Sequence, residues 1–394
     1  MGAILAHPPV VFLRHVATLL HSQAMLRPVA LLLLLLAAPR SLAVETLRIA
    51  IEDTGSEVRI RGQGLGFGAD SEEATYVSIP SDVAIVRRKA GKLEVNGAPV
   101  LGDSVRFRAG LSTSEDAGTI PGEQPIKAGN TQVRGDVVVR PLREGLQLIN
   151  VIPLEDYLAA VLGSEMPVSF PAEALKAQAV AARTYALQKK LDAYSNAFHL
   201  GSSVLHQVYG GVNREDPRTR AAVDATRGQV LTYELAPIEA YFHASCGGRT
   251  ESGQDALHRD LPYLQPVDCP CGRLPASRWS ASMSDAEIKA ALKRPAQGMK
   301  VTARTSTRRV TRVTMGDGSS VDGVELRRRL GYTRLKSLDF EVERTDQGYQ
   351  FSGRGYGHGA GLCQWGAKAL ADKGRGYLEI LTHYYPGAEL QQLY

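Results

Sequence analysis

The sequence predicts an α+β protein in which a β-rich N-terminal region packs on a mixed α/β core. Short runs of apolar–polar alternation occupy the chain from Val44 to about Leu148, separated by glycine and aspartate clusters. From Pro153 onwards two helical patterns follow each other directly. After residue 229 short strand and helix patterns alternate without long linkers. The domains expected are therefore residues 44–148 and residues 149–394.

The first 43 residues have the pattern of a secretory signal peptide. Met25-Leu-Arg-Pro precedes an apolar run that includes six consecutive leucines, and Ser41 and Ala43 stand at the usual cleavage spacing. The run is shorter than the roughly 20 apolar residues that a membrane span needs. We therefore expect an exported protein of the periplasm or cell envelope. Met25 is an alternative start, and an uncleaved membrane anchor is the alternative to cleavage.

Charge gives little reason to expect nucleic acid as a partner. The leader holds three arginines and no acidic residue, so removing it lowers the formal net charge from +5 to +2. A near-neutral chain lacks the basic excess that phosphate backbones require.

The individual elements follow from periodicity and from breaking residues. Strands are expected at 47–51, 58–61 and 133–140, a helix at 153–162 that Gly163 ends, and an alanine-rich helix at 171–190. Further strands are expected at 229–233, 239–242, 309–315 and 338–342. Further helices are expected at 285–293 and at 363–372, the latter as the final helix of the chain.

The break between the first two helices carries one acidic residue, Glu165, among Met166, Pro167, Val168 and Phe170. Burial against apolar groups raises the pKa of a carboxyl group, which keeps a general acid protonated near neutral pH. A loop glutamate is more commonly a solvated surface group. Glu155 and Asp156 on the preceding helix are candidates for a second carboxylate, although acids at a helix start are usually capping or solvated residues.

Four cysteines follow the leader. His243 and Cys246, with Cys269 and Cys271, offer a Cys3His zinc site. Disulfides are an equal alternative in an exported protein, and His243 could instead line a cleft. Cys363 is expected to be a buried free thiol outside this set.

A glycine-rich segment, GYGHGAG, lies at residues 355–361. No strand–loop–helix unit with a suitably spaced acid surrounds it, so a nucleotide-binding loop is a poor interpretation. Alternating glycines let the backbone approach a flat ligand such as a sugar strand. His358, Tyr356 and Gln364 would then supply polar contacts. Trp365 offers a stacking face or belongs to the core.

Three blocks in order closely resemble the SpoIID/LytB family of cell-wall proteins. They are LEDYLAAVLGSEMPVSFPAEALKAQAVAARTYAL at 154–187, YFHASCGGRTES at 241–252 and GRGYGHGAGLCQWGAKALADKG at 353–374. Trp279 and GVELRRRLG at 323–331 add to the likeness. The resemblance covers roughly residues 140–390.

The resemblance implies peptidoglycan glycan strands as substrate and Glu165 as the catalytic residue of a lytic transglycosylase, acting on strands stripped of stem peptides. The counterpart of Arg183 lies near the catalytic glutamate in the family, whereas an exposed helix arginine is the alternative. His358 takes its site role from the same match. Some family members hold zinc with cysteine and histidine, so a structural zinc is expected at most, and the chemistry itself requires no cofactor.

The resemblance also leaves two other functions open. A LytB-like module would bind the wall without cutting it and would recruit or stimulate a separate amidase. A zinc amidase that cuts stem peptides ranks third, because three sulfur ligands suit a closed structural site better than an open catalytic one.

Overall fold

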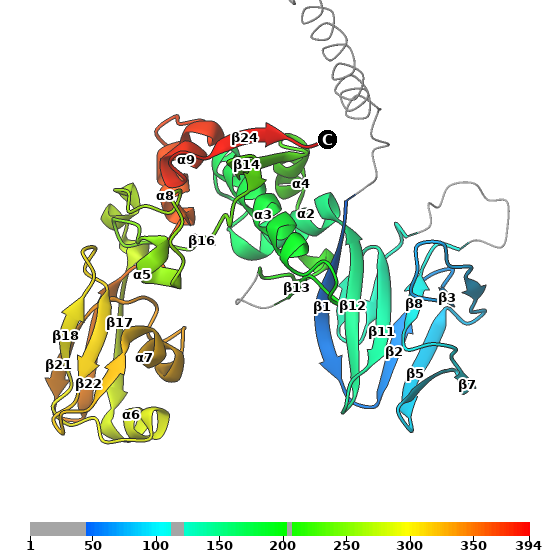
Figure 1. The fold of residues 1–394 in the computed structure, drawn as a ribbon, viewed down its shortest axis with the longest axis horizontal. Coiled ribbons are helices and arrows are strands. Elements are labelled where there is room, and N and C mark those ends of the chain that lie inside the picture. Colours follow the sequence, from blue (N-terminus) through cyan, green and yellow to red (C-terminus); the bar gives the residue numbers. More distant parts are fainter. Residues whose placement is uncertain (1–44, 112–121, 203–206) are drawn as a thin grey trace, which may run out of the picture. The chain divides into compact units, whose positions relative to one another are not determined.

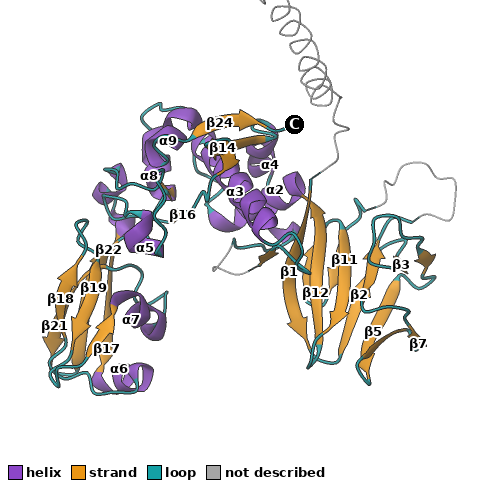
Figure 2. Cartoon of the chain, viewed as in Figure 1, coloured by secondary structure: helices purple, strands orange, loops and turns teal. Residues whose placement is uncertain are grey.

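The computed structural model describes residues 45–111, 122–202 and 207–394. Glu45–Tyr394 form one compact unit of mixed helices and sheets, which confirms the α+β prediction (Figures 1 and 2). The predicted leader lies outside the described residues. Within the described ranges, no helix is both long enough and apolar enough to span a membrane.

Two sheets, antiparallel apart from one edge pair, make up the N-terminal region (Figure 1). The first has the order β13-β1-β12-β11-β8-β3-β4, with bounds Leu200–Gly201, Thr46–Thr54, Leu146–Pro153, Asp136–Pro141, Val105–Arg108, Gly66–Gly68 and Val77–Ser78. The second has the order β10-β9-β2-β5-β6-β7, with bounds Thr131–Val133, Ile126–Ala128, Glu57–Arg61, Val83–Lys89, Lys92–Val95 and Ala98–Pro99. The strands predicted at 47–51 and 58–61 are confirmed as β1 and β2. The strand predicted at 133–140 begins only at Asp136, as β11, because Val133 ends β10 in the other sheet. In β2, for example, Val58 and Ile60 are buried while their neighbours are exposed, as the alternation requires.

Strand β12 joins the N-terminal sheets to the helices. It pairs with β1 and β11, and α2 (Leu154–Glu165) begins directly at its end. One hydrophobic core runs from Leu47 in β1 through Leu158 in α2 to the C-terminal helices. The predicted boundary between residues 148 and 149 falls inside this strand.

Helix α2 is longer than the sequence predicts. It continues through Gly163 to Glu165, so Gly163 is not its stop signal. A Cβ atom at Gly163 would lie 1.9 Å from the carbonyl oxygen of Arg214, in the short 3-10 turn η1 (Val212–Arg214). Glycine is therefore needed at this position for the close approach of two backbones, and it remains helical.

Helix α3 (Ala172–Asp192) begins after Pro171, as predicted, and α4 (Pro217–Asp224) packs against both α2 and α3. Beside them lies a three-stranded sheet of β15, β14 and β24, with bounds Ala236–Pro237, Gln229–Tyr233 and Glu389–Gln392. Helix α8 (Gln364–Ala371) confirms the helix predicted at 363–372. It is not the last one, because α9 (Tyr377–Tyr384) and β24 follow it.

Of the strand predicted at 239–242, only Phe242 pairs in a sheet. Together with His243 it forms β16 (Phe242–His243), which lies parallel to β23 (Leu362–Cys363). Helix α5 (Gly253–Leu257) and the 3-10 turns η2 (Pro270–Arg273) and η3 (Pro275–Ser277) follow β16 along the chain.

Residues 278–354 have a hydrophobic core of their own, which includes Trp279, Phe340 and Phe351. It lies among two three-stranded sheets and two helices, α6 (Asp285–Leu292) and α7 (Gly323–Leu330). The sheet orders are β17-β22-β21 and β18-β19-β20, with bounds Arg278–Ser284, Gly348–Arg354, Asp339–Thr345, Lys300–Arg304, Val310–Thr314 and Ser320–Asp322. The helix predicted at 285–293 and the strands predicted at 309–315 and 338–342 are confirmed.

The close approach at Gly163 is testable by adding one methyl group. Gly163→Ala should lower the free energy of unfolding by about 1–3 kcal/mol, because the contacted atom is backbone and cannot rotate away. Gly55→Ala is the matched control, since nothing lies within 4 Å of the added atom there. Urea unfolding of both variants measures the difference. Equal stability of the two would contradict the assignment.

Candidate active site

Glu165 is the last residue of α2 and lies at the junction predicted from the sequence. Its carboxylate oxygen Oε1 accepts a hydrogen bond from the backbone N–H of Val208 at 2.7 Å. The segment that carries Val208 runs on through Gly210 to η1 and packs on the end of α2. The carboxylate is thus partly covered by a chain segment more than 40 residues away in sequence.

The environment of Glu165 favours its protonated form. Burial raises the pKa of the Glu165 carboxyl above its usual value, and the hydrogen bonds from Val208 and Gln364 offset this only in part. The last turn of α2 has the sequence LGSE and carries no basic side chain, so the negative end of the helix dipole acts in the same direction. A raised pKa makes this carboxyl group better suited to donate a proton than an ordinary surface glutamate.

Gln364, the first residue of α8, lies beside this carboxyl group. Its side chain is close enough to lower the pKa of the Glu165 carboxyl, and its Nε2 donates to Oε1 of Gln178 at 3.5 Å. Only 5 % of Gln364 is exposed. The predicted substrate-binding glutamine, which follows the glycine-rich block, therefore lies beside the predicted acid.

The structure does not bring Arg183 to Glu165. Arg183 is fully buried and forms a two-pronged ion pair with Glu155, with 2.9 Å between Nε and Oε1 and 2.6 Å between Nη2 and Oε2. Its remaining hydrogen bonds go to the carbonyl oxygens of Gln229 and Val223. Arg183 is thus neither an exposed helix arginine nor a residue at the predicted acid.

The two alternative carboxylates are engaged elsewhere. Burial would raise the pKa of Glu155, but hydrogen bonds from Arg183 and from the Tyr394 hydroxyl lower it below its usual value. Asp156 forms an ion pair with Arg220 at 2.8 Å. Neither carboxylate is therefore free to act as a second catalytic group beside Glu165.

The ring of His358 is held by the backbone on both sides. Its Nε2 donates to the carbonyl oxygen of Phe242 at 2.9 Å, and its Nδ1 accepts from the Ala360 N–H at 3.1 Å. Burial lowers the pKa of His358 to about 4, so the ring is neutral at pH 7. Both ring nitrogens serve the fold of the glycine-rich segment.

Two aromatic residues of the same segment differ in accessibility. Tyr356 is 39 % exposed, and the ammonium of Lys336 lies 5.7 Å from its ring centre. Its phenol ring is accessible to a ligand. Trp365 is partly buried and packs edge-on against Phe170, which comes from the break after Glu165.

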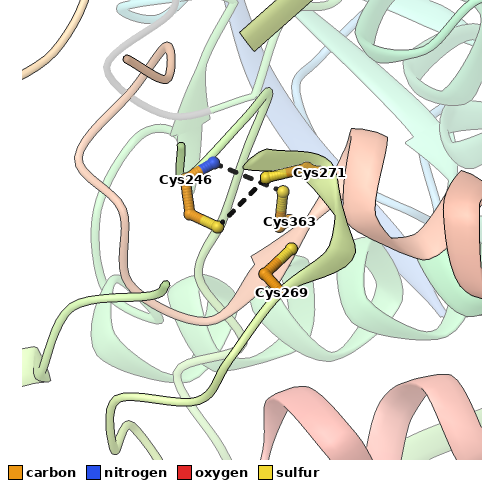
Figure 3. A group of neighbouring side chains, drawn as sticks. All are labelled: Cys246, Cys269, Cys271 and Cys363. Atoms are coloured by element: carbon orange, nitrogen blue, oxygen red, sulfur yellow. Dashed lines mark hydrogen bonds between the residues drawn. The ribbon is translucent and has the colours of Figure 1, made fainter. Parts of the chain in front are cut away.

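The four cysteines form one buried cluster, shown in Figure 3. The sulfur atoms of Cys246, Cys269, Cys271 and Cys363 all lie within 4.8 Å of one another, and all four are free thiols in the described part of the chain. The prediction that Cys363 stands apart is wrong, because the parallel pairing of β16 with β23 places it beside the 243–246 segment. His243 is not among the clustered ligand atoms; its Nδ1 donates to the carbonyl oxygen of Ala360.

Sequence reasoning missed two groups at this site. Val208 contributes a backbone N–H, which no side-chain pattern can reveal. Gln178 is fully buried, and its Nε2 has no hydrogen-bond partner among the described residues. The sequence does contain a signal for Gln178, because it is the one amide side chain in the alanine-rich stretch AEALKAQAVAAR of α3.

Comparisons with known proteins identify the family. The model of the family named SpoIID, stage II sporulation protein, matches residues 142–233, which contain Glu165 and both flanking helices. The chain is 31% identical over 308 residues to stage II sporulation protein D of Bacillus subtilis (strain 168), covering 72% of this chain and 88% of that protein. It is also 31% identical over 311 residues to the protein of the same name from Bacillus amyloliquefaciens, covering 74% and 88%. The chain belongs to the SpoIID family.

A further relative has a different name and a different length. The chain is 33% identical over 288 residues to the amidase enhancer of Bacillus subtilis (strain 168), which covers 59% of this chain but 40% of that protein.

The buried position of Arg183 predicts a structural role. Arg183→Met should lower the free energy of unfolding by about 3–5 kcal/mol, because it leaves the Glu155 carboxylate buried without a partner. Arg220→Met is the control, because its pair with Asp156 is about one-third exposed and worth roughly 0–1 kcal/mol. Urea unfolding compares the two. A stable Arg183→Met protein would refute this role.

The raised pKa of Glu165 predicts a pH-dependent stability difference. Since folding raises this pKa, the charged carboxylate is less favourable in the folded state than in the unfolded state. Glu165→Gln should therefore be more stable than wild type at neutral pH, and the gain should vanish as the pH falls through the folded pKa towards the unfolded one. Glu173→Gln should show the opposite sign, because Lys176 and the Tyr377 N–H lower the pKa of Glu173 despite partial burial. Urea unfolding at a series of pH values measures both.

Proposed function

We propose that this protein is a peptidoglycan lytic transglycosylase in which Glu165 is the general acid and the general base. The observation that carries the proposal is the setting of Glu165. It is one desolvated carboxyl group with a raised pKa, placed by Val208 and Gln364. Family membership supports a substrate in the cell wall, and glycan strands free of stem peptides are the form proposed here.

The chemistry needs one carboxyl group when the nucleophile belongs to the sugar. Protonated Glu165 gives its proton to the glycosidic oxygen as the C1–O bond breaks, and the leaving strand departs with that proton. The carboxylate then accepts the proton of the 6-hydroxyl of the same sugar as its oxygen bonds to C1. The product is a 1,6-anhydro end, and no water is consumed. The engagement of Glu155 and Asp156 in ion pairs agrees with a mechanism that uses a single acid.

The surrounding residues have supporting roles. Gln364 and the Val208 N–H orient the carboxyl group, and the exposed ring of Tyr356 offers a stacking face for a sugar. The proposal includes a structural zinc at the cysteine cluster and no cofactor for the chemistry. It also includes export, with residues 1–43 as the leader.

A second function has specific support. The relative named amidase enhancer is 33% identical over 288 residues. A non-catalytic module that binds glycan and stimulates a separate cell-wall amidase would use the same surface without proton transfer. The desolvation of Glu165 favours the enzyme, because a carboxylate that only binds sugar gains nothing from a raised pKa.

The decisive assay incubates purified protein with denuded glycan strands and with peptide-bearing peptidoglycan, and identifies the products by mass spectrometry. Wild type should release fragments with 1,6-anhydro ends. Glu165→Gln should bind glycan but lose activity by at least about 100-fold, since acid and base catalysis each contribute roughly 10²–10⁴-fold. Glu173→Gln, on the next helix, should remain active.

Two results would overturn the proposal. Cleavage by Glu165→Gln at the wild-type rate would exclude Glu165 as the acid. Glycan binding without cleavage by wild type, together with stimulation of an added amidase, would establish the recruiting module in its place.

A further inference from the structure

We infer that Cys246, Cys269, Cys271 and Cys363 together bind one zinc ion as four thiolates, and that this ion fixes Gln364 beside Glu165. The ligand set thus takes Cys363 in place of His243. The metal site stands on the geometry of the cysteines alone, whereas the effect on cleavage rests on the proposed function.

The spacing of the sulfur atoms suits a single tetrahedral ion. Four ligands at zinc–sulfur distances of about 2.3 Å form a tetrahedron with edges of about 3.8 Å. All four sulfur atoms lie within 4.8 Å of one another, and those of Cys246 and Cys271 are 3.3 Å apart. They approach from three separate segments, as Figure 3 shows. A cluster of several irons would hold its cysteines further apart.

The surroundings supply donors for negatively charged sulfur. The backbone N–H groups of Cys246 and Gly366 both point at Sγ of Cys363, each at 3.3 Å. The Ser245 hydroxyl donates to Sγ of Cys271, and the Tyr384 hydroxyl lies 3.1 Å from Sγ of Cys269. Four thiolates on a divalent ion leave a net charge of −2, which these donors and the start of α8 stabilise.

Gly366 leaves the space that the cysteine cluster occupies beside α8. A Cβ atom at Gly366 would lie 2.4 Å from Sγ of Cys269, and would also collide with the hydroxyl of Tyr384. The first turn of α8 can therefore reach the sulfur atoms only with glycine there.

His243 lies outside the ligand set because neither of its ring nitrogens is among the clustered ligand atoms. Its Nδ1 donates to Ala360, and its ring centre lies 5.4 Å from that of His358, towards the glycine-rich segment. Its buried Nε2 has no hydrogen-bond partner within the described ranges and is not among the clustered ligand atoms. His243 therefore packs against the segment that the ion anchors.

The metal site and the proposed active site are linked by two consecutive residues, Cys363 and Gln364. Cys363 ends β23 and caps α8, and the next residue, Gln364, lies beside Glu165 and lowers the pKa of its carboxyl. Zinc would tie Cys363 to the 246 and 269–271 segments, and so would fix where α8 begins. The ion takes no part in the proton transfers, since four protein ligands leave no open position.

The ligand set is tested first on wild-type protein. Mass spectrometry should find one zinc per chain. After exchange with cobalt(II), the absorption spectrum should show the strong sulfur-to-cobalt charge transfer and long-wavelength ligand-field bands of four thiolates, rather than those of three thiolates with one imidazole. This readout needs no variant to fold and does not depend on glycan cleavage.

Two variants then separate the candidate fourth ligands. Cys363→Ser should lose the zinc or the four-thiolate spectrum. His243→Asn, which can keep the hydrogen bond to Ala360, should retain one zinc and the wild-type spectrum. Loss of zinc from the His243 variant but not from the Cys363 variant would overturn the assignment. Wild-type protein that is purified without reductant and contains disulfides but no metal would overturn it as well.

The link to the active site is tested by reversible removal of zinc. Metal-depleted protein should cut glycan about 100-fold more slowly, since a shift of about 1 Å in a positioning group can have that effect, and added zinc should restore the rate. Full activity without zinc would refute the link while leaving the ligand set intact. A wild type that binds zinc but never cuts glycan would refute the proposed function alone.

Discussion

The buried ion pair between Glu155 and Arg183 determines how the elements around the candidate active site meet. One guanidinium joins α2, where Glu155 lies, to α3, which carries Arg183 itself. It also bonds the carbonyl oxygens of Val223 at the end of α4 and of Gln229 in β14. The Tyr394 hydroxyl and the Gly228 N–H complete the contacts of the carboxylate. An unpaired charge at this depth would be costly, so the helices can pack only where both partners meet. Glu165 stands at the far end of α2, and its position follows from this arrangement.

The local elements were largely predictable because they depend on short patterns. Alternation identified β1 and β2, and Pro171 identified the start of α3. Glu165 was recognisable from its apolar neighbours and from the resemblance to a known family. The end of α2 could not be predicted, because glycine is both a common helix terminator and the residue that permits a close contact. Only the position of Arg214 shows that Gly163 serves the second purpose.

The long-range contacts of the site could not be predicted from the sequence, because the partners lie far apart along the chain. Arg183 could be predicted to matter, but its partner is 28 positions away and its depth depends on four elements. Cys363 is 117 positions from Cys246, and only the pairing of β16 with β23 brings them together. The Val208 N–H carries no side-chain signature at all. A sequence therefore predicts which residues belong to the site better than it predicts the distant residue that each of them contacts.

The raised pKa of Glu165 implies that its charged form destabilises the folded state relative to a neutral side chain, and this cost is itself an argument for function. The Glu165 carboxylate is partly buried at the negative end of α2, and the last turn of this helix carries no basic side chain. A negative charge is unfavourable in that position. A binding surface for neutral sugars would work as well with glutamine, which hydrogen-bonds without the desolvation cost. Proton transfer is the role that glutamine cannot fill. The same residue is also held on two sides, by Val208 and by Gln364, as a group that must meet one particular oxygen atom would be. Both features together support catalysis over recruitment as the reason that an acid occupies this position.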